Sequence, residues 1–168
     1  MPVTPDQIRE LRELTSAGVM DCKRALEHSN GDVKGAIAYL AEQGIAAAAK
    51  RSERETGQGV IESYVHNGRV GVLVEVNCET DFVARTEDFQ KLAREVALQI
   101  AGLPWTLAVS EEQLPADFQP VAGQEAVLLK QASIRDSSKT IQQMVTDTIA
   151  KTGENIQIRR FARFELGQ

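Results

Sequence analysis

An Asn-Gly pair between two runs of strand-forming residues is the feature that most constrains the fold of this chain. The flanking runs, residues 60–66 and 69–76, are rich in valine and other β-forming side chains. Asn67-Gly68 between such runs predicts a hairpin with a two-residue type I′ turn, which pairs residue 65 with residue 70, 63 with 72 and 61 with 74. In that register one face of the hairpin is apolar and we expect it to be buried. Its members are Ile61, Val65, Val70, Val72 and Val74.

The C-terminal half supplies a third strand and two helices. Apolar residues recur at helical spacing over 86–101 and 138–151, whereas residues 102–124 are punctuated by proline and glycine and are expected to be irregular. Residues 155–166 alternate as a strand with an apolar row, expected to be buried, of Ile156, Ile158, Ala162 and Phe164. The predicted fold class is therefore α+β, with a three-stranded antiparallel sheet backed by helices on one face.

The N-terminal residues read as three short helices. Thr4 and Gln7 form a capping box around Pro5, and Asp32 is placed to cap the third helix. The apolar face expected for that helix comprises Val33, Ala36, Ile37 and Leu40, and Gly44 is expected to end it. A separate connecting helix is expected from Ile45 to Thr56, followed by a boundary at Gly57–Gly59. We therefore predict a module at 1–54 and an α+β core domain at 55–168.

Composition excludes several classes of function. The net charge is −5, and residues 57–154 carry 8 basic against 14 acidic side chains, so direct binding to a nucleic-acid backbone is not expected. The two cysteines lack CxxC spacing and the N-terminus has no signal-peptide pattern, which favours a reducing, cytoplasmic location. No apolar run is long enough for a membrane span. No cofactor or metal site is predicted, because two histidines and two scattered cysteines do not form a ligand cluster.

The run Glu75–Arg85 marks the change from strand to helix periodicity. It carries a carboxylate, Asp81, beside a large apolar ring, Phe82. Spacing alone favours a structural interpretation in which Asp81 caps a helix and Phe82 fills the core. The alternative is that both side chains meet a partner, since a strand-to-helix turn is a rigid mount for contact residues.

Three runs resemble signatures of the elongation factor Ts family, which exchanges the nucleotide of the translational GTPase EF-Tu. The run EVNCETDFVAR at 75–85 is similar to the central signature of that family. LRELTSAGVMDCKRAL at 11–26 resembles the N-terminal signature, and Gly153-Glu154-Asn155-Ile156 with Arg159-Arg160-Phe161 resembles the C-terminal strand. The resemblance implies that the N-terminal helices form a ubiquitin-associated (UBA-like) module. It also implies a guanine nucleotide exchange factor that is not an enzyme.

The resemblance also implies roles for particular residues. The run Thr80, Asp81, Phe82 and Val83 would disturb the Mg²⁺ and phosphate site of EF-Tu and so promote GDP release. Other contacts with EF-Tu would come from Val19, Met20, Lys23, Lys50, Arg51, His66 and Gly153. The GTPase would be bound both in its GDP form and free of nucleotide.

Short members of the family dimerise, and a three-stranded sheet leaves one face open. The predicted outer face carries Val60, Tyr64 and Leu73, and Phe161 lies opposite the apolar row of the last strand. We therefore expect a non-covalent homodimer that buries these side chains, with His66 reaching EF-Tu from the second subunit.

Two other classes of function would each use only part of the sequence. His66 and Cys78 could be imagined as the base and nucleophile of an enzyme, but the hairpin register does not pair them and no carboxylate orients the histidine. A UBA-like protein- or RNA-binding module with no exchange activity is the other alternative. It leaves most of the chain unexplained.

Overall fold

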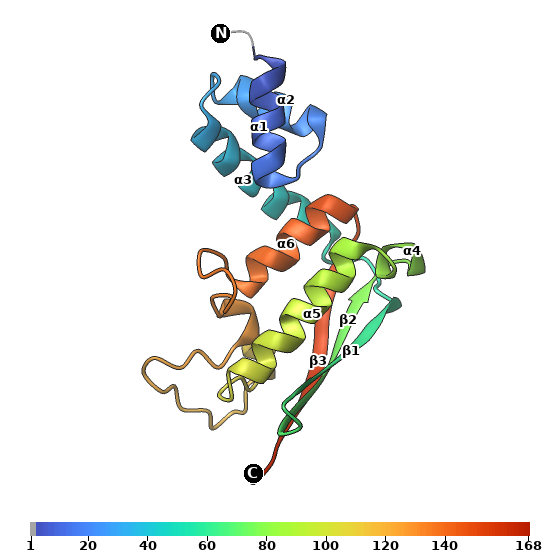
Figure 1. Ribbon diagram of the computed structural model, residues 1–168, viewed down its shortest axis with the longest axis vertical. Helices are drawn as coiled ribbons and strands as arrows, with labels where there is room; N and C mark the ends of the chain where they lie inside the picture. Colours follow the sequence, from blue (N-terminus) through green and yellow to red (C-terminus); the bar gives the residue numbers. More distant parts are fainter. Residues whose placement is uncertain (1–2) are drawn as a thin grey trace.

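The computed structural model describes residues 3–168, which form an N-terminal helical module joined to a larger sheet-and-helix core (Figure 1). The helices are α1 (Pro5–Thr15), α2 (Val19–His28), α3 (Val33–Arg51), α4 (Asp81–Ala84), α5 (Glu87–Gly102) and α6 (Ile141–Thr152). The strands β1 (Gln58–His66), β2 (Val70–Cys78) and β3 (Ile156–Glu165) form one antiparallel sheet in the order β1-β2-β3. The predicted α+β class, with three N-terminal helices and a three-stranded antiparallel sheet backed by helices, is confirmed, and the three helices are consistent with the expected UBA-like module.

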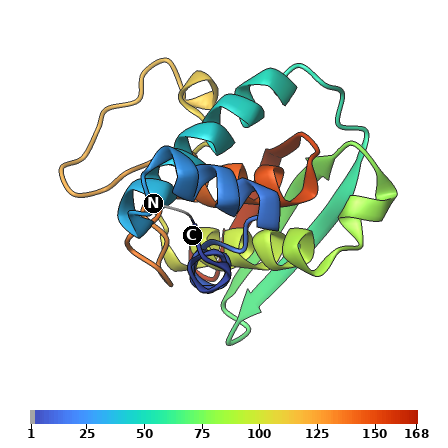
Figure 2. The ribbon, with the colours of Figure 1, turned by 90° about the horizontal axis from the view of Figure 1, so that it is seen from above.

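The module begins as its capping residues predict. Thr4 and Gln7 form the capping box at the start of α1, and the carboxylate of Asp32 accepts a hydrogen bond of 2.8 Å from the Gly35 N–H at the start of α3. These bonds satisfy amide groups that have no partner inside the helix. Seen from above, the three helices pack around one another (Figure 2). The small core that they share consists of Leu11, Cys22, Ala25, Leu26 and Ala36.

Helix α3 is longer than predicted and contradicts two expectations. It continues through Gly44 to Arg51, so Gly44 is not its C-terminal cap and no separate connecting helix exists between Ile45 and Thr56. An alanine-rich run after Gly44 favours helix, and Ala48 packs against the core of the sheet. Ile37, expected on the apolar face, is exposed, because the module buries only the Ala36 side of the helix.

The hairpin turn is as predicted, but its register is not. Asn67 and Gly68 both have positive φ, and the Arg69 N–H donates to the His66 carbonyl over 2.9 Å, as in a type I′ turn. Arg69 is left outside the ladder, so His66 pairs with Val70. This single extra residue shifts every pair by one.

The shift exchanges the two faces of β1. On β2 the predicted inward residues Val72 and Val74 are buried, as is Val76 on the same face. Tyr64 and Val60 on β1 pair with Val72 and Val76. Ile61 and Val65, by contrast, are 63% and 66% exposed. The prediction that Ile61 and Val65 are buried is therefore wrong, since a one-residue slip moves a side chain to the opposite face of a sheet.

A bulge produces a similar correction on β3. Val76 pairs with Ile158 but Glu75 pairs with Arg160, so Arg159 is an extra residue. The inward row therefore changes from even to odd positions. Phe161 faces the core, and Phe164, which was predicted to be buried, is 73% exposed on the outer face.

Helices α5 and α6 cover the inner face of the sheet, and a long irregular segment follows α5 (Figure 1). Two buried glutamine side chains hold that segment. The amide of Gln99 donates to Gln131 over 3.1 Å, and the amide of Gln131 donates to Thr106 over 2.7 Å. The expectation of irregular structure over 102–124 is confirmed, with one short 3₁₀ turn at Glu111–Gln113. Across residues 3–168, none of the helices combines the length and apolar character that crossing a membrane requires.

Candidate functional site

The turn between β2 and α5 presents Phe82 to solvent. Thr80, not Asp81, caps the short helix α4 by accepting a hydrogen bond from the Val83 N–H over 3.4 Å. Val83 and Ala84 point into the core, and Phe82 is therefore turned outward and is 77% exposed. The interpretation in which Asp81 caps the helix and Phe82 fills the core is wrong. A large, exposed aromatic ring on a short, capped helix is typical of a contact residue.

The carboxylate beside Phe82 is also at the surface. Asp81 forms an ion pair with Arg85 one helical turn later, with 2.9 Å between the carboxylate oxygen and the guanidinium nitrogen. The Arg85 side chain is exposed and that of Asp81 is half exposed, so the pair contributes little to stability.

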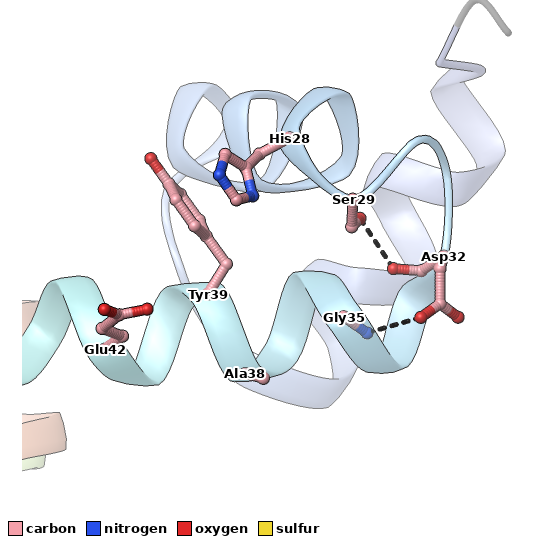
Figure 3. Close-up of a pocket in the computed structure, with 7 residues that line it drawn as sticks. All are labelled: His28, Ser29, Asp32, Gly35, Ala38, Tyr39 and Glu42. Atoms are coloured by element: carbon pink, nitrogen blue, oxygen red, sulfur yellow. Dashed lines mark hydrogen bonds between the residues drawn. The ribbon is translucent and has the colours of Figure 1, made fainter.

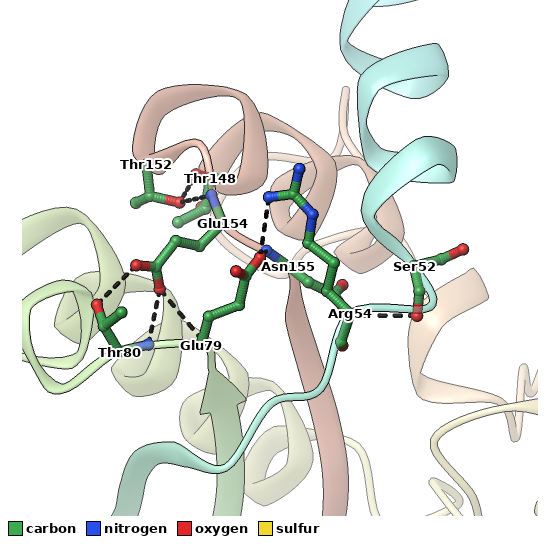
Figure 4. A network of polar contacts seen from close by, with 8 residues as sticks. All are labelled: Ser52, Arg54, Glu79, Thr80, Thr148, Thr152, Glu154 and Asn155. Atoms are coloured by element: carbon green, nitrogen blue, oxygen red, sulfur yellow. Dashed lines mark hydrogen bonds and ion pairs between the residues drawn. The ribbon is translucent and has the colours of Figure 1, made fainter.

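A network of polar contacts holds the backbone just before α4 (Figure 4). The Glu154 carboxylate accepts hydrogen bonds from the N–H groups of Glu79 and Thr80, at 3.1 and 3.0 Å, and from the Thr80 hydroxyl at 2.6 Å. In return, the Glu79 carboxylate accepts from the Asn155 N–H over 2.7 Å. Two loops that are distant in sequence thus satisfy each other's backbone groups.

The same network reaches the end of the N-terminal module. The buried Asn155 amide donates to the carbonyls of Ser52 and Arg54, at 3.3 and 2.9 Å, and the Arg54 guanidinium lies 3.4 Å from Glu79. The segment between α3 and β1 is therefore tied to the loop that precedes α4.

Cys78 lies at the end of β2 but has no reactive character. Burial raises the pKa of its thiol to about 11, and the nearby Glu154 carboxylate contributes to the same increase. A thiol with a high pKa is a poor nucleophile. Among residues 3–168, no group of three or more His, Cys, Asp or Glu side chains could hold a metal ion.

The other predicted site residues are spread over the molecule. Val19 and Met20 are exposed at the start of α2, and Lys23 forms an ion pair of 3.8 Å with Glu27. Lys50 and Arg51 form the last residues of α3. Gly153 ends α6 with φ 74° and directly precedes Glu154, which accepts hydrogen bonds from Thr80.

His66 is separated from Phe82 within one molecule. It lies at the hairpin tip, where its ring bonds Tyr64 over 3.0 Å, while the residues that lead to α4 lie at the other end of β2. The two ends of β2 are eight residue steps apart, which corresponds to about 26 Å at the usual rise per residue. One copy of the chain cannot place both side chains on the same small contact.

Sequence reasoning missed Glu79, Glu154 and Asn155 as residues that position the site. The available signal was an acidic and an amide side chain directly after the glycine that ends α6. Their partners are separated from them by about 75 to 103 residues along the chain. No local pattern identifies such pairs.

A shallow depression of about 400 Å³ lies between α2 and α3, away from Phe82 (Figure 3). His28 stacks on Tyr39 there with 4.3 Å between ring centroids, and Asp32 and Glu42 supply its carboxylates. Because Asp32 already caps α3, this depression is explained by helix packing and capping.

Comparison with known proteins gives a consistent result. The family described as "Elongation factor TS" matches residues 7–116 and again residues 79–168. The elongation factor Ts of Heliobacterium modesticaldum is 44% identical, with 99% of this chain and 91% of that protein aligned. The protein of the same name from Leptospira biflexa is 46% identical, with 99% of both chains aligned. That of Thermosynechococcus vestitus is 45% identical over 96% of this chain but only 64% of its own length.

Proposed function

The chain belongs to the elongation factor Ts family, and from that premise we propose that it is a guanine nucleotide exchange factor for EF-Tu. In this role it promotes GDP release during the elongation phase of protein synthesis. The cytoplasmic location expected from the sequence is part of this proposal. The observation that carries the proposal is the outward position of Phe82, which is 77% exposed beside Asp81 on a capped turn.

The proposed mechanism rests on linkage between two binding equilibria. A partner accelerates release of GDP and Mg²⁺ only if it binds nucleotide-free EF-Tu better than the nucleotide-bound form. The coupling is reciprocal, so nucleotide in turn expels the partner. Thr80 to Val83 form the element that enters the Mg²⁺ and phosphate region, with Phe82 as the wedge and Asp81 as a competing carboxylate.

Magnitudes indicate that Phe82 does not act alone. A 10⁴-fold shift between the two forms of EF-Tu needs about 5.5 kcal/mol of differential binding. Full burial of one large apolar side chain supplies about 1.5–3 kcal/mol. The remainder requires a second surface, and exposed apolar side chains on the module, Val19 and Met20, are suited to it. Lys23 adds positive charge on α2, and Lys50 and Arg51 add positive charge at the end of α3.

The direct test is a release assay with fluorescent GDP on EF-Tu. The wild-type protein is expected to accelerate release, and Phe82→Ala to lose most of the acceleration while keeping the fold, because the ring makes no contribution to the core. Leu107→Ala is the matched control, since Leu107 is also an exposed apolar side chain but lies on the segment after α5. Absence of acceleration by the wild type at micromolar concentration would leave a UBA-like binding module as the better description.

We further propose that the protein is a non-covalent homodimer joined through the outer face of the sheet. The corrected register assigns this face to Ile61, Val65, Leu73 and Phe164, all of them exposed in the single chain. Each of these side chains contributes about 1.5–3 kcal/mol if it is fully buried. Both cysteines are buried, so neither is available for a disulfide between copies.

The proposed dimer would also explain how His66 contacts EF-Tu. Because His66 and Phe82 lie at opposite ends of β2, a second copy is needed for both to contact one EF-Tu molecule near the same interface. Light scattering should give twice the 18.4 kDa chain mass. Leu73→Glu combined with Phe164→Glu should give a folded monomer with weak exchange activity. A wild type that scatters as a monomer at micromolar concentration and still exchanges nucleotide would exclude this arrangement.

A further inference from the structure

We infer that Glu154 is a positioning residue for nucleotide exchange, which holds the loop before α4 so that Phe82 stays extended from the surface. This inference rests on the proposed function and deepens it. Glu154 lies in the loop between α6 and β3 and points toward the end of β2, as Figure 4 shows. Its hydrogen bonds go to Glu79 and Thr80 rather than to Phe82 or Asp81, so its effect on the partner is exerted through the backbone.

The bonds that Glu154 accepts immobilise the residues that set the direction of α4. Its two oxygens accept from the N–H groups of Glu79 and Thr80 and from the Thr80 hydroxyl, at 3.1, 3.0 and 2.6 Å. These are charge-assisted bonds to a carboxylate, the stronger class of hydrogen bond. Thr80 Oγ1 in turn accepts from the Val83 N–H that begins α4. A continuous chain of bonds thus runs from Glu154 to the helix that carries Phe82.

Helix α4 is too short to hold the Phe82 side chain in place by itself. Val83 and Ala84 anchor one side of α4 in the core, but a helix of four residues has too few internal bonds to fix its own orientation. A wedge must be rigid before it meets its target, because any ordering on binding is subtracted from the binding energy. Glu154 removes that ordering cost in advance.

Glu154→Ala should therefore show a specific kinetic pattern. The rate of GDP release from EF-Tu at saturating concentration of this protein should fall about 10- to 100-fold, since a misplacement of about 1 Å in a contact group can cost up to about 100-fold. Its half-saturating concentration should change less, because the module surface is untouched. Glu154→Gln should restore most of the rate, since its carbonyl oxygen can accept from both N–H groups and the Thr80 hydroxyl can accept from its amide.

Thr152→Ala is the matched control. Its hydroxyl lies two residues away and donates to the Thr148 carbonyl within α6 over 2.9 Å, and it accepts from the Glu154 N–H over 3.5 Å. These bonds stay on the α6 side and do not reach the loop before α4, so release at saturation should be unchanged in this variant. An equal loss in Thr152→Ala and Glu154→Ala would show that any disturbance of the loop between α6 and β3 has the same effect, and would overturn a specific role for Glu154.

A double-mutant cycle separates positioning from general stability. In a Phe82→Ala background, adding Glu154→Ala should cause a much smaller further loss of release, because only the Asp81 carboxylate is left to position. Equal loss with and without the Phe82 ring would overturn the inference while leaving the proposed function intact. If Phe82→Ala has no effect by itself, the proposed role of the turn fails and the inference fails with it.

Amide hydrogen exchange in the free protein supplies a readout that does not depend on EF-Tu. The Thr80 N–H should exchange faster in Glu154→Ala than in the wild type, while amides in the middle of α5 keep their protection. If Glu154→Ala does not fold, Glu154→Asp replaces it in every measurement, because the shorter carboxylate keeps the charge but cannot span the same gap. Unchanged protection of Thr80 in the folded variant would contradict the inference.

Discussion

The N-terminal module and the sheet core bury very different amounts of apolar volume. Five side chains form the core of the module, and three of them are alanine or cysteine. The core between the sheet and its helices buries twenty residues, among them Phe89 and Ile100. A three-helix unit with so few large side chains is near the lower limit for independent folding. We therefore expect the module to depend on the rest of the chain for its stability.

Helix α3 connects the module to the larger core. Its first half belongs to the module, while Ala48 in its second half packs against the sheet core. Gly44 lies where α3 passes α6, so that a Cβ there would be 3.9 Å from Ala150. Because α3 spans both cores, it can hold the module surface at Val19 and Met20 at a fixed distance from Phe82. This holds although the core of the module is small.

The largest expected loss of stability follows from a substitution in the core between the sheet and its helices. Phe89→Ala should lower the free energy of unfolding by about 3–5 kcal/mol, because Phe89 is fully buried between α5 and the sheet. Denaturant unfolding followed by circular dichroism measures this loss. The same measurement on Leu107→Ala, an exposed position, should show a change within about 0.5 kcal/mol.

A cavity in the small core should have a local effect. Leu26→Ala removes the centre of the module and should cost about 2–5 kcal/mol there, enough to unfold α1 and α2 while the sheet stays folded. Hydrogen exchange should rise throughout α1 and α2 and remain slow in α5. Uniformly faster exchange in both regions would mean that the two cores unfold as one unit.

Removing the module tests the division at residue 54. A fragment of residues 55–168 should still melt cooperatively. It should be less stable by roughly 1–3 kcal/mol, because the buried Asn155 amide loses both of its carbonyl acceptors, Ser52 and Arg54, and Ala48 no longer covers the core. A fragment that begins at residue 41 retains the second half of α3 and should recover most of that loss. An aggregated 55–168 fragment would indicate one shared core.

The smallest effect concerns Gly44 and has the opposite sign. Gly44 lies inside a continuous helix, and a methyl group added there would make only ordinary van der Waals contacts. Gly44→Ala should therefore raise the free energy of unfolding by about 0.5–1 kcal/mol, measured by the same denaturant titration. Gly153→Ala is the contrasting control and should lower it, since Gly153 has φ 74°. Destabilisation by Gly44→Ala would show that α6 cannot accept a methyl group at the crossing.

Local signals determined much of this protein. The capping box at Thr4, the cap at Asp32 and the Asn67-Gly68 turn act over four residues or fewer, so their sequence patterns predicted them directly. The alternation of valines likewise identified the buried face of β2. The family signatures pointed to the turn at Phe82, but spacing alone could not show whether the ring was buried.

Only the tertiary structure decided which faces are exposed and how the site is held. The omission of Arg69 from the ladder exchanges the two faces of β1, and the bulge at Arg159 exchanges the faces of the residues that follow it in β3. Both features depend on pairing between strands. Phe82 points outward because Val83 and Ala84 meet the core, and Glu154 reaches Thr80 across 74 residues of chain. The free energies that select these arrangements come from burial and hydrogen bonding between distant segments, which no local periodicity records.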